Sequence, residues 1–263
     1  MPQTKYYKAL RKTGRDVILR VIGCCARPSN GIHIISGHTA HPTNPDIKYM
    51  EQTMAKLSTM VHFIRIEEAI QLIENRNQPT EPLCAFTFDD GFDDCYYYIA
   101  PVLEKYHTNA IFFVNPNFVD GDDAYIEHFT TVPMHNPGKR PMRWEQLKDL
   151  QNRGFIIGAH TMDHFLTNSE DHKELEYQIV ECKHVIEDRL STSCNHFAWP
   201  YGRLERTNSY AVELACNNYN YVFSQSDYRH YFSFDGKVIN RRHFEPFWPI
   251  SHIKYFMSKT KQY

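Results

Sequence analysis

Cys84-Ala85-Phe86-Thr87-Phe88-Asp89-Asp90-Gly91-Phe92 is an apolar run that ends on two adjacent carboxylates and a glycine, and this stretch decides the fold. Its apolar part, Leu83 to Phe88, is short and bounded by turn residues, which favours a strand buried on both faces. Asp89 and Asp90 then lie at the carboxyl end of that strand, where parallel α/β folds bind ligands. Considered alone, a plain strand followed by an Asp-Asp-Gly turn fits equally well.

Length and composition are those of a globular protein that can build a core. The chain has 263 residues, 42% hydrophobic and 23% charged, and its formal charge of −2 gives no electrostatic case for nucleic-acid binding. Its seven cysteines include no Cys-x-x-Cys pair, which indicates neither a disulfide framework nor a cysteine zinc site and fits a reducing compartment. We see no convincing signal peptide and no apolar run of membrane-spanning length, so we expect a cytoplasmic location, including the inner face of the membrane.

Short apolar segments alternate with helical patterns along the chain. Expected strands cover residues 17–22, 32–35, 60–64, 83–88, 110–114, 155–158, 196–198, 221–223 and 238–240. Expected helices cover residues 47–58, 66–73, 97–106, 144–152, 170–190 and 209–217, and a last helix begins near Ile250. This alternation predicts one α/β domain over residues 1–263, with a parallel sheet or barrel.

Residues 115–141 form an unusually long connection that is rich in Pro, Gly, Asp and His. Connections of this length inside a compact domain are usually functional or disordered, so we interpret this one as a lid. His38 or His41, which follow the expected strand 32–35, should line the mouth of any site at this end of the sheet.

Two histidines, His160 and His164, follow the expected strand 155–158. If Thr161 begins a helical turn, their spacing directs both imidazoles to one point, as metal binding requires. With 15 histidines in the chain, such a pair can also arise by chance. Combined with Asp89 and Asp90, however, the pair offers two imidazoles and a carboxylate, a known set for a divalent cation. The second carboxylate then stays free as a general base towards water, and a positive group is expected beside the two acids because like charges repel.

A third strand end, Phe197-Ala198-Trp199-Pro200-Tyr201-Gly202-Arg203, breaks into a Pro-x-Gly turn. Such turns present backbone N–H groups outward, which is the usual way to hold a developing oxyanion.

Together these motifs resemble those of a known family. Thr87-Phe88-Asp89-Asp90-Gly91, His160-Thr161-x-x-His164 and Trp199-Pro200-Tyr201-Gly202 are similar, in order and spacing, to the first three motifs of the polysaccharide deacetylases, the NodB-homology carbohydrate esterases of family four. The form seen here looks most like the subgroup that acts on surface-polysaccharide amino sugars. The resemblance implies a distorted (β/α)7-8 barrel and a divalent metal, usually Zn²⁺, with Co²⁺, Ni²⁺ or Mn²⁺ as alternatives.

By position, the resemblance also assigns the central roles. Asp89 would be the general base, and Asp90, His160 and His164 would bind the metal. Thr161 would brace the loop between the two histidines.

The resemblance also implies residues for oxyanion stabilisation, substrate contact and proton donation. The backbone N–H of Tyr201 would stabilise the oxyanion, and Trp199 and Pro200 are expected beside the substrate. His243, after the expected strand 238–240, would be the general acid of the fifth motif, although a solvent-exposed or salt-bridged histidine fits equally well.

The chain departs from the family pattern at two points. Many members carry an arginine near the position of Trp199 that orients the base, and none stands there. Arg241 or Arg242 could supply this positive partner or face the substrate instead. Ser224-Gln225-Ser226-Asp227 also matches the fourth motif poorly.

The sequence therefore predicts a metal-dependent hydrolase that removes an acetyl group from an N-acetylated amino sugar in cell-envelope or surface-polysaccharide synthesis. The substrate would be a free, nucleotide-linked or lipid-linked carbohydrate. A sugar deformylase, an O-deacetylase and a non-catalytic glycan-binding relative are the alternatives. The missing arginine and the poor match to the fourth motif favour the last, and the presence of both Asp89 and Asp90 argues against it.

Overall fold

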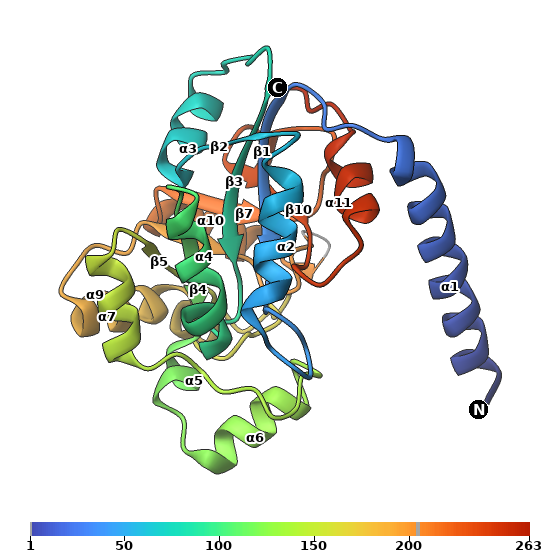
Figure 1. Ribbon diagram of the computed structural model, residues 1–263. Coiled ribbons are helices and arrows are strands. Elements are labelled where there is room, and N and C mark those ends of the chain that lie inside the picture. Colours follow the sequence, from blue (N-terminus) through green and yellow to red (C-terminus); the bar gives the residue numbers. More distant parts are fainter. Residues whose placement is uncertain (1, 204–205) are drawn as a thin grey trace.

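One sheet of ten strands runs through the described residues, and most of the helices lie around it (Figure 1). The computed structural model describes residues 2–203 and 206–263. The strands are β1 (Gly31–Gly37), β2 (His62–Phe63), β3 (Pro82–Phe88), β4 (Ala110–Val114), β5 (Ile156–Ala159), β6 (His196–Ala198), β7 (Tyr221–Ser224), β8 (Phe232–Ser233), β9 (Val238–Asn240) and β10 (Arg242–His243). The α-helices are α1 (Pro2–Cys25), α2 (Ile47–Leu57), α3 (Ile66–Glu74), α4 (Ala100–Lys105), α5 (Pro116–Asp120), α6 (Asp123–Thr131), α7 (Trp144–Asn152), α8 (His172–Glu176), α9 (Cys182–Leu190), α10 (Ser209–Asn218) and α11 (Ile250–Met257). Two π-helical turns, η1 (Cys95–Ile99) and η2 (Tyr177–Glu181), lead into α4 and α9.

The sheet is curled and almost entirely parallel. Its strand order is β10-β1-β3-β4-β5-β6-β7-β9-β8, with β2 beside β3, and among the described strands only β8 and β9 pair in the antiparallel sense. β9 pairs with β7 while β10 pairs with β1, and Arg241 alone separates β9 from β10. One stretch, residues 238–243, therefore reaches from β7 to β1 and closes the curl, which confirms the expected distorted (β/α) barrel.

Strand β3 shows how the core is built on both sides of the sheet. Successive side chains of a strand point to opposite faces. Ala85 packs with Ile111 and Phe113 in one buried cluster, whereas Phe86 and Phe88 belong to the larger cluster that the helices share. The expected strand 83–88 is thus confirmed, and the two acids follow it at its carboxyl end.

The N-terminal part differs from the sequence-based expectation. Residues 17–22, expected as a strand, lie within α1. Their β-branched side chains favour a strand locally, but Val17, Ile18, Val21 and Ile22 also follow the spacing of one helix face. Leu19 is buried on the side where α1 packs against α11. No helix in the described part of the chain is long and apolar enough to span a membrane.

The long connection 115–141 is not structureless, because it contains α5 and α6. Near its end Lys139 is buried, and its ammonium group lies 2.8 Å from Oδ2 of Asp94 and donates to Oγ1 of Thr39 at 2.5 Å. This buried ion pair ties the end of the connection to the segments that follow β1 and β3.

Candidate active site

The carboxyl ends of the parallel strands surround a cavity of about 640 Å³. Its wall is formed by residues that follow β1, β3, β5, β6, β7 and β10, by His243 at the end of β10, and by residues 133–136 of the long connection. Cavities of this size commonly bind small molecules. His38 lies in this wall, as expected, and His41 does not.

Asp90, His160 and His164 come together at this cavity, and all three are buried. The Nε2 atoms of both histidines lie 3.5 Å from Oδ1 of Asp90. That oxygen accepts no hydrogen bond from any described residue, although it is buried. An unpaired buried carboxylate oxygen costs free energy, whereas a cation between the three ligand atoms would satisfy it. These residues therefore fit the divalent ion that the sequence predicts.

Neighbouring groups fix the orientation of the first histidine and its loop. Nδ1 of His160 donates to the carbonyl oxygen of Ala198 at 2.7 Å, which leaves its Nε2 free for a metal. The side-chain amide of Asn115 donates to the carbonyl oxygen of Thr161 at 2.9 Å. Oγ1 of Thr161 accepts the N–H of Phe165 at 2.8 Å. These bonds hold the loop between the two histidines.

The turn that carries the histidines is not helical. Thr161 and His164 have φ angles of 64° and 53°, so the expectation of a helical turn beginning at Thr161 is wrong, although the two imidazoles do converge. Asp90 and Tyr201 are left-handed too, with φ angles of 76° and 62°. This conformation is unfavourable for residues other than glycine, and it is concentrated at functional sites.

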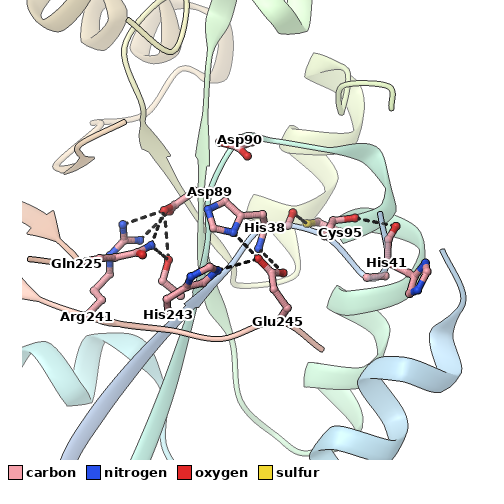
Figure 2. A network of polar contacts seen from close by, with 12 residues as sticks. His38, His41, Asp89, Asp90, Cys95, Gln225, Arg241, His243 and Glu245 are labelled. Atoms are coloured by element: carbon pink, nitrogen blue, oxygen red, sulfur yellow. Dashed lines mark hydrogen bonds and ion pairs between the residues drawn. The ribbon is translucent and has the colours of Figure 1, made fainter. Parts of the chain in front are cut away.

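Asp89 lies outside the metal-ligand set and is held by a buried guanidinium. Nη1 and Nη2 of Arg241 donate to Oδ1 and Oδ2 of Asp89 at 2.7 and 2.9 Å. The hydroxyl of Ser36 and the side-chain amide of Gln225 donate to Oδ2 at 3.2 and 3.4 Å. Figure 2 shows Arg241 and Gln225 meeting the Asp89 carboxylate, while the carboxylate of Asp90 points elsewhere.

Arg241 is therefore the positive partner that the sequence requires beside the two acids. Burial alone would raise the pKa of Asp89, but the charge and hydrogen bonds of Arg241, together with the nearby imidazoles of His160 and His38, outweigh burial and hold that pKa well below its ordinary value. The guanidinium also lies over the rings of Phe113 and Phe223, 5.1 and 5.8 Å from their centroids. It comes from the junction of β9 and β10 and not from the neighbourhood of Trp199, where the family arginine is missing.

A second group of ionisable side chains, His38, His243 and Glu245, lies beside Asp89 (Figure 2). Nδ1 of His38 and Nε2 of His243 lie 2.6 and 3.0 Å from the same oxygen of Glu245, Oε1. Burial disfavours the charged form of His38, but the charge and hydrogen bond of Glu245, together with the charges of Asp90 and Asp89, outweigh burial and raise the pKa of His38 to about 10. Burial likewise opposes ionisation of Glu245, but the charges and hydrogen bonds of His38 and His243 together outweigh burial and lower the pKa of Glu245 to about 2. His38 is therefore protonated at neutral pH.

Both groups bring ligand atoms close enough for a metal ion, but their hydrogen bonding differs. The carboxylate of Glu245 already accepts hydrogen bonds from His38 and His243, whereas Oδ1 of Asp90 has no hydrogen-bond partner among the described residues. The metal fits the Asp90 group better, and the Glu245 group is better suited to proton transfer.

The residues of the third motif occupy different places. Tyr201 lines the cavity, and none of the described residues accepts a hydrogen bond from its backbone N–H. Trp199 and Pro200 are buried and do not line the cavity. The ring of Trp199 packs 4.8 Å from that of Phe197, so the geometry does not bring these two residues to the substrate as expected.

Arg241, Arg242 and His243 alternate in direction, as successive residues of an extended chain do. Arg241 reaches Asp89 and His243 lines the cavity. Arg242 is buried on the other side, where its guanidinium donates to the backbone carbonyl groups of residues 256 and 259. The structure thus selects Arg241 as the partner of Asp89 and keeps Arg242 away from the cavity, against the expectation of substrate contact.

Sequence reasoning missed Ser36, Gln225 and Glu245. Gln225 lies in the segment that matches the fourth motif poorly, yet it reaches Asp89. Glu245 follows a strand of only two residues, which leaves no periodic signal. Only the position of Ser36 near the end of an expected strand pointed to the site.

Comparison with known proteins agrees with this geometry. The family model described as polysaccharide deacetylase matches residues 76–221, more than half of the chain. YxkH of Bacillus subtilis (strain 168), whose name refers to the same family, is 24% identical over 147 residues, which are 56% of this chain and 47% of that protein. The chain thus spans about half the length of this curated relative.

Solved structures of low sequence identity share the fold. IcaB from Ammonifex degensii superposes with a TM-score of 0.69 and 20% identity, covering 89% of this chain and 99% of that one. The Streptococcus pyogenes deacetylase PplD superposes with a TM-score of 0.64 and 18% identity, covering 88% and 99%. The barrel, the order of its motifs and the matched family model lead to one conclusion: this chain belongs to the polysaccharide deacetylase family.

Proposed function

We propose that this protein is a metal-dependent hydrolase that removes the acetyl group from an N-acetylated amino sugar of cell-envelope or surface-polysaccharide synthesis. One observation carries the proposal: the two adjacent acids have different partners. Asp90 faces His160 and His164, whereas Asp89 is bonded to Arg241. A site that only bound a metal would need one carboxylate, so the second argues for catalysis and against a purely glycan-binding role.

Asp90, His160 and His164 would hold the divalent ion. Two imidazoles and a carboxylate suit Zn²⁺, and Co²⁺, Ni²⁺ and Mn²⁺ are the alternatives. When bound, such an ion polarises the acetyl carbonyl group and lowers the pKa of the water beside it.

In the proposed reaction, Asp89 accepts a proton from the water that attacks the acetyl carbonyl carbon. Arg241 and Gln225 hold the carboxylate in one orientation for this transfer. The backbone N–H of Tyr201 donates to the carbonyl oxygen as negative charge develops on it. The C–N bond then breaks, and the nitrogen takes up a proton, so that the products are acetate and a free amino sugar.

The proton for the leaving nitrogen is assigned to the group formed by His38, His243 and Glu245. The family pattern points to His243, and Glu245 joins it to a second imidazole that is protonated at neutral pH. The turnover of His38→Gln and of His243→Gln shows which of the two histidines donates the proton, because the variant that lacks the donor loses the larger part of the activity.

The proposed substrate is a nucleotide-linked or lipid-linked sugar met at the cytoplasmic side of the membrane. All seven cysteines are free, which supports a reducing compartment.

Acetate release from metal-stripped and reconstituted protein tests the proposal. The substrates are N-acetylglucosamine oligomers and a nucleotide-linked N-acetylated sugar, with N-formyl and O-acetyl analogues beside them. We expect acetate from an N-acetylated sugar only after the metal is restored. Formate from the N-formyl analogue alone, or acetate from the O-acetyl analogue alone, would replace the proposal with the corresponding alternative. A protein that binds metal and releases neither product would contradict it.

A further inference from the structure

Helix α1 presents an apolar face that nothing in the described part of the chain covers. Val17, Ile18, Val21 and Ile22 are 53–68% exposed, and they are four of the ten large hydrophobic residues that stand exposed among those whose side chains are described. Figure 1 shows α1 outside the barrel, beside α11. A cluster of exposed apolar residues on one helix usually marks an interaction surface.

The orientation of α1 is fixed by its contact with α11. Gly23 is buried, and a Cβ atom built there would stand 1.9 Å from the carbonyl oxygen of Ser251. Leu19 is buried, one turn away from Gly23, and Nζ of Lys254 donates to the carbonyl oxygen of Cys24 at 2.7 Å. The apolar face therefore points away from the body of the protein and does not simply rotate inward.

Positive charges flank this face on both sides. At about 100° of rotation per residue, Val17, Ile18, Val21 and Ile22 fall within an arc of about 140°. Arg20 lies at about 60° beyond one edge of this arc and Arg15 at about 20° beyond the other, and both are exposed. Asp16 is the only acid in the α1 sequence, and it lies on the side that faces α11.

We propose that this face lies on an anionic membrane surface, with the four apolar side chains among the lipid chains and the two arginines at the headgroups. Helices that lie in a membrane interface combine an apolar face with basic residues at its edges. A second copy of the chain fits less well, because it would bring the arginines of both copies together, and α1 offers only Asp16, on the side that faces α11, to offset them. Arg15 also contacts Asp16, at 3.4 Å, but this pair is exposed and therefore weak. The inference does not depend on the proposed chemistry.

Co-sedimentation of the full chain with vesicles tests this inference without any substrate. The vesicles are phosphatidylcholine with and without phosphatidylglycerol, at low and high salt. We expect sedimentation with the anionic vesicles at low salt and release at high salt. Val21→Gln/Ile22→Gln, which keeps good helix formers in α1, should weaken binding at least about tenfold. Arg15→Gln/Arg20→Gln should weaken it by about fivefold per arginine.

Val132→Gln is the matched control, because Val132 is 54% exposed but lies at the end of α6. It should bind as the unchanged chain does, and circular dichroism should show all variants folded. No sedimentation of the unchanged chain with anionic vesicles would overturn the inference, as would equal sedimentation of Val21→Gln/Ile22→Gln. A dimer in analytical ultracentrifugation that this double variant dissociates, without vesicle binding, would assign the face to a second copy instead and also overturn it.

Discussion

Asp89 and Arg241 form a two-point ion pair whose side chains are 3% and 0% exposed. Removing one partner of such a pair leaves the other charged group buried and unpaired. Arg241→Gln should therefore raise the pKa of Asp89 and leave its carboxylate free to rotate. We expect turnover to fall by about a hundredfold, as misplaced catalytic groups commonly cause.

Arg241→Lys keeps the charge but loses the two-point geometry, so its turnover should lie between that of the unchanged chain and that of Arg241→Gln. Steady-state kinetics with a thermal melt of each variant make the test. Full turnover in a folded Arg241→Gln would show that Arg241 does not position the base.

The pH profile of kcat/KM should depend on Glu245. Because Glu245 raises the pKa of His38 to about 10, the protonated imidazole persists from neutral pH up to that value and is lost above it. Glu245→Gln removes this support, so the pKa of His38 should fall to its ordinary value of 6.5 or below. The alkaline limb of the profile should then move to lower pH by several units. An unmoved limb would exclude His38 from the proton transfer.

At the scale of residues, the sequence was informative wherever a motif joins residue type to a strand end. Asp89, Asp90, His160 and His164 could be predicted on that basis, and the structure brings them together. The choice between Arg241 and Arg242 could not be predicted, because it depends on which of the two side chains points into the barrel. The pairing of β10 with β1 decides this, and no local sequence pattern reveals that pairing.

Gly158 allows strand β5 to pack closely against Phe113 and His196 of the neighbouring strands. A Cβ atom at Gly158 would stand 2.6 Å from the ring of Phe113 and 3.0 Å from the carbonyl oxygen of His196. Gly158→Ala should lower stability by about 1–3 kcal/mol through overpacking, which denaturant unfolding measures. Gly14→Ala is the control, because nothing lies within 4 Å of that position in α1, and it should leave stability equal or slightly higher. A Gly158→Ala protein as stable as the unchanged chain would contradict the close packing.

The long connection before α7 depends on Lys139. Lys139→Met leaves the carboxylate of Asp94, only 2% exposed, without its cation, which should cost about 3–5 kcal/mol of stability. Because residues 133–136 form part of the cavity wall, KM should also rise. Lys105→Met, which removes an exposed ion pair with Glu51, should change neither quantity appreciably. An unchanged KM in Lys139→Met would show that the ion pair between Lys139 and Asp94 does not influence substrate binding.

At the scale of elements, most strands and helices were predictable because their apolar spacing is regular. Residues 17–22 were not, since the same β-branched residues satisfy both a strand preference and the spacing of a helix face, and only the contact with α11 decides between them. Helices α5 and α6 were missed because each is short and lies among turn-forming residues.

For the whole molecule, the closure of the sheet places the groups that we propose for catalysis. Residues 238–243 pass from β7 to β1, and so bring Arg241 to Asp89 across 152 residues of sequence. The barrel could be expected from the family motifs, but this bridge could not, because β10 has only two residues and the expected strand 238–240 does not reveal which strands it joins.

Metal binding should stabilise the whole fold, since a ligand of the native state alone shifts the unfolding equilibrium. Removing the ion with a chelator should lower Tm, and Zn²⁺ should restore it. His164→Ala should give a lower Tm that no longer responds to the ion. An identical response in His164→Ala would place the metal elsewhere.

Metal content and acetate turnover, measured together on Asp89→Asn and Asp90→Asn, distinguish the roles of the two adjacent acids. We predict that Asp89→Asn keeps nearly the full metal content and loses most of its turnover, because Asp89 serves as the base and not as a ligand. Asp90→Asn should lose both. Equal loss of metal in the two variants, or full turnover in Asp89→Asn, would contradict the division of labour between the two aspartates.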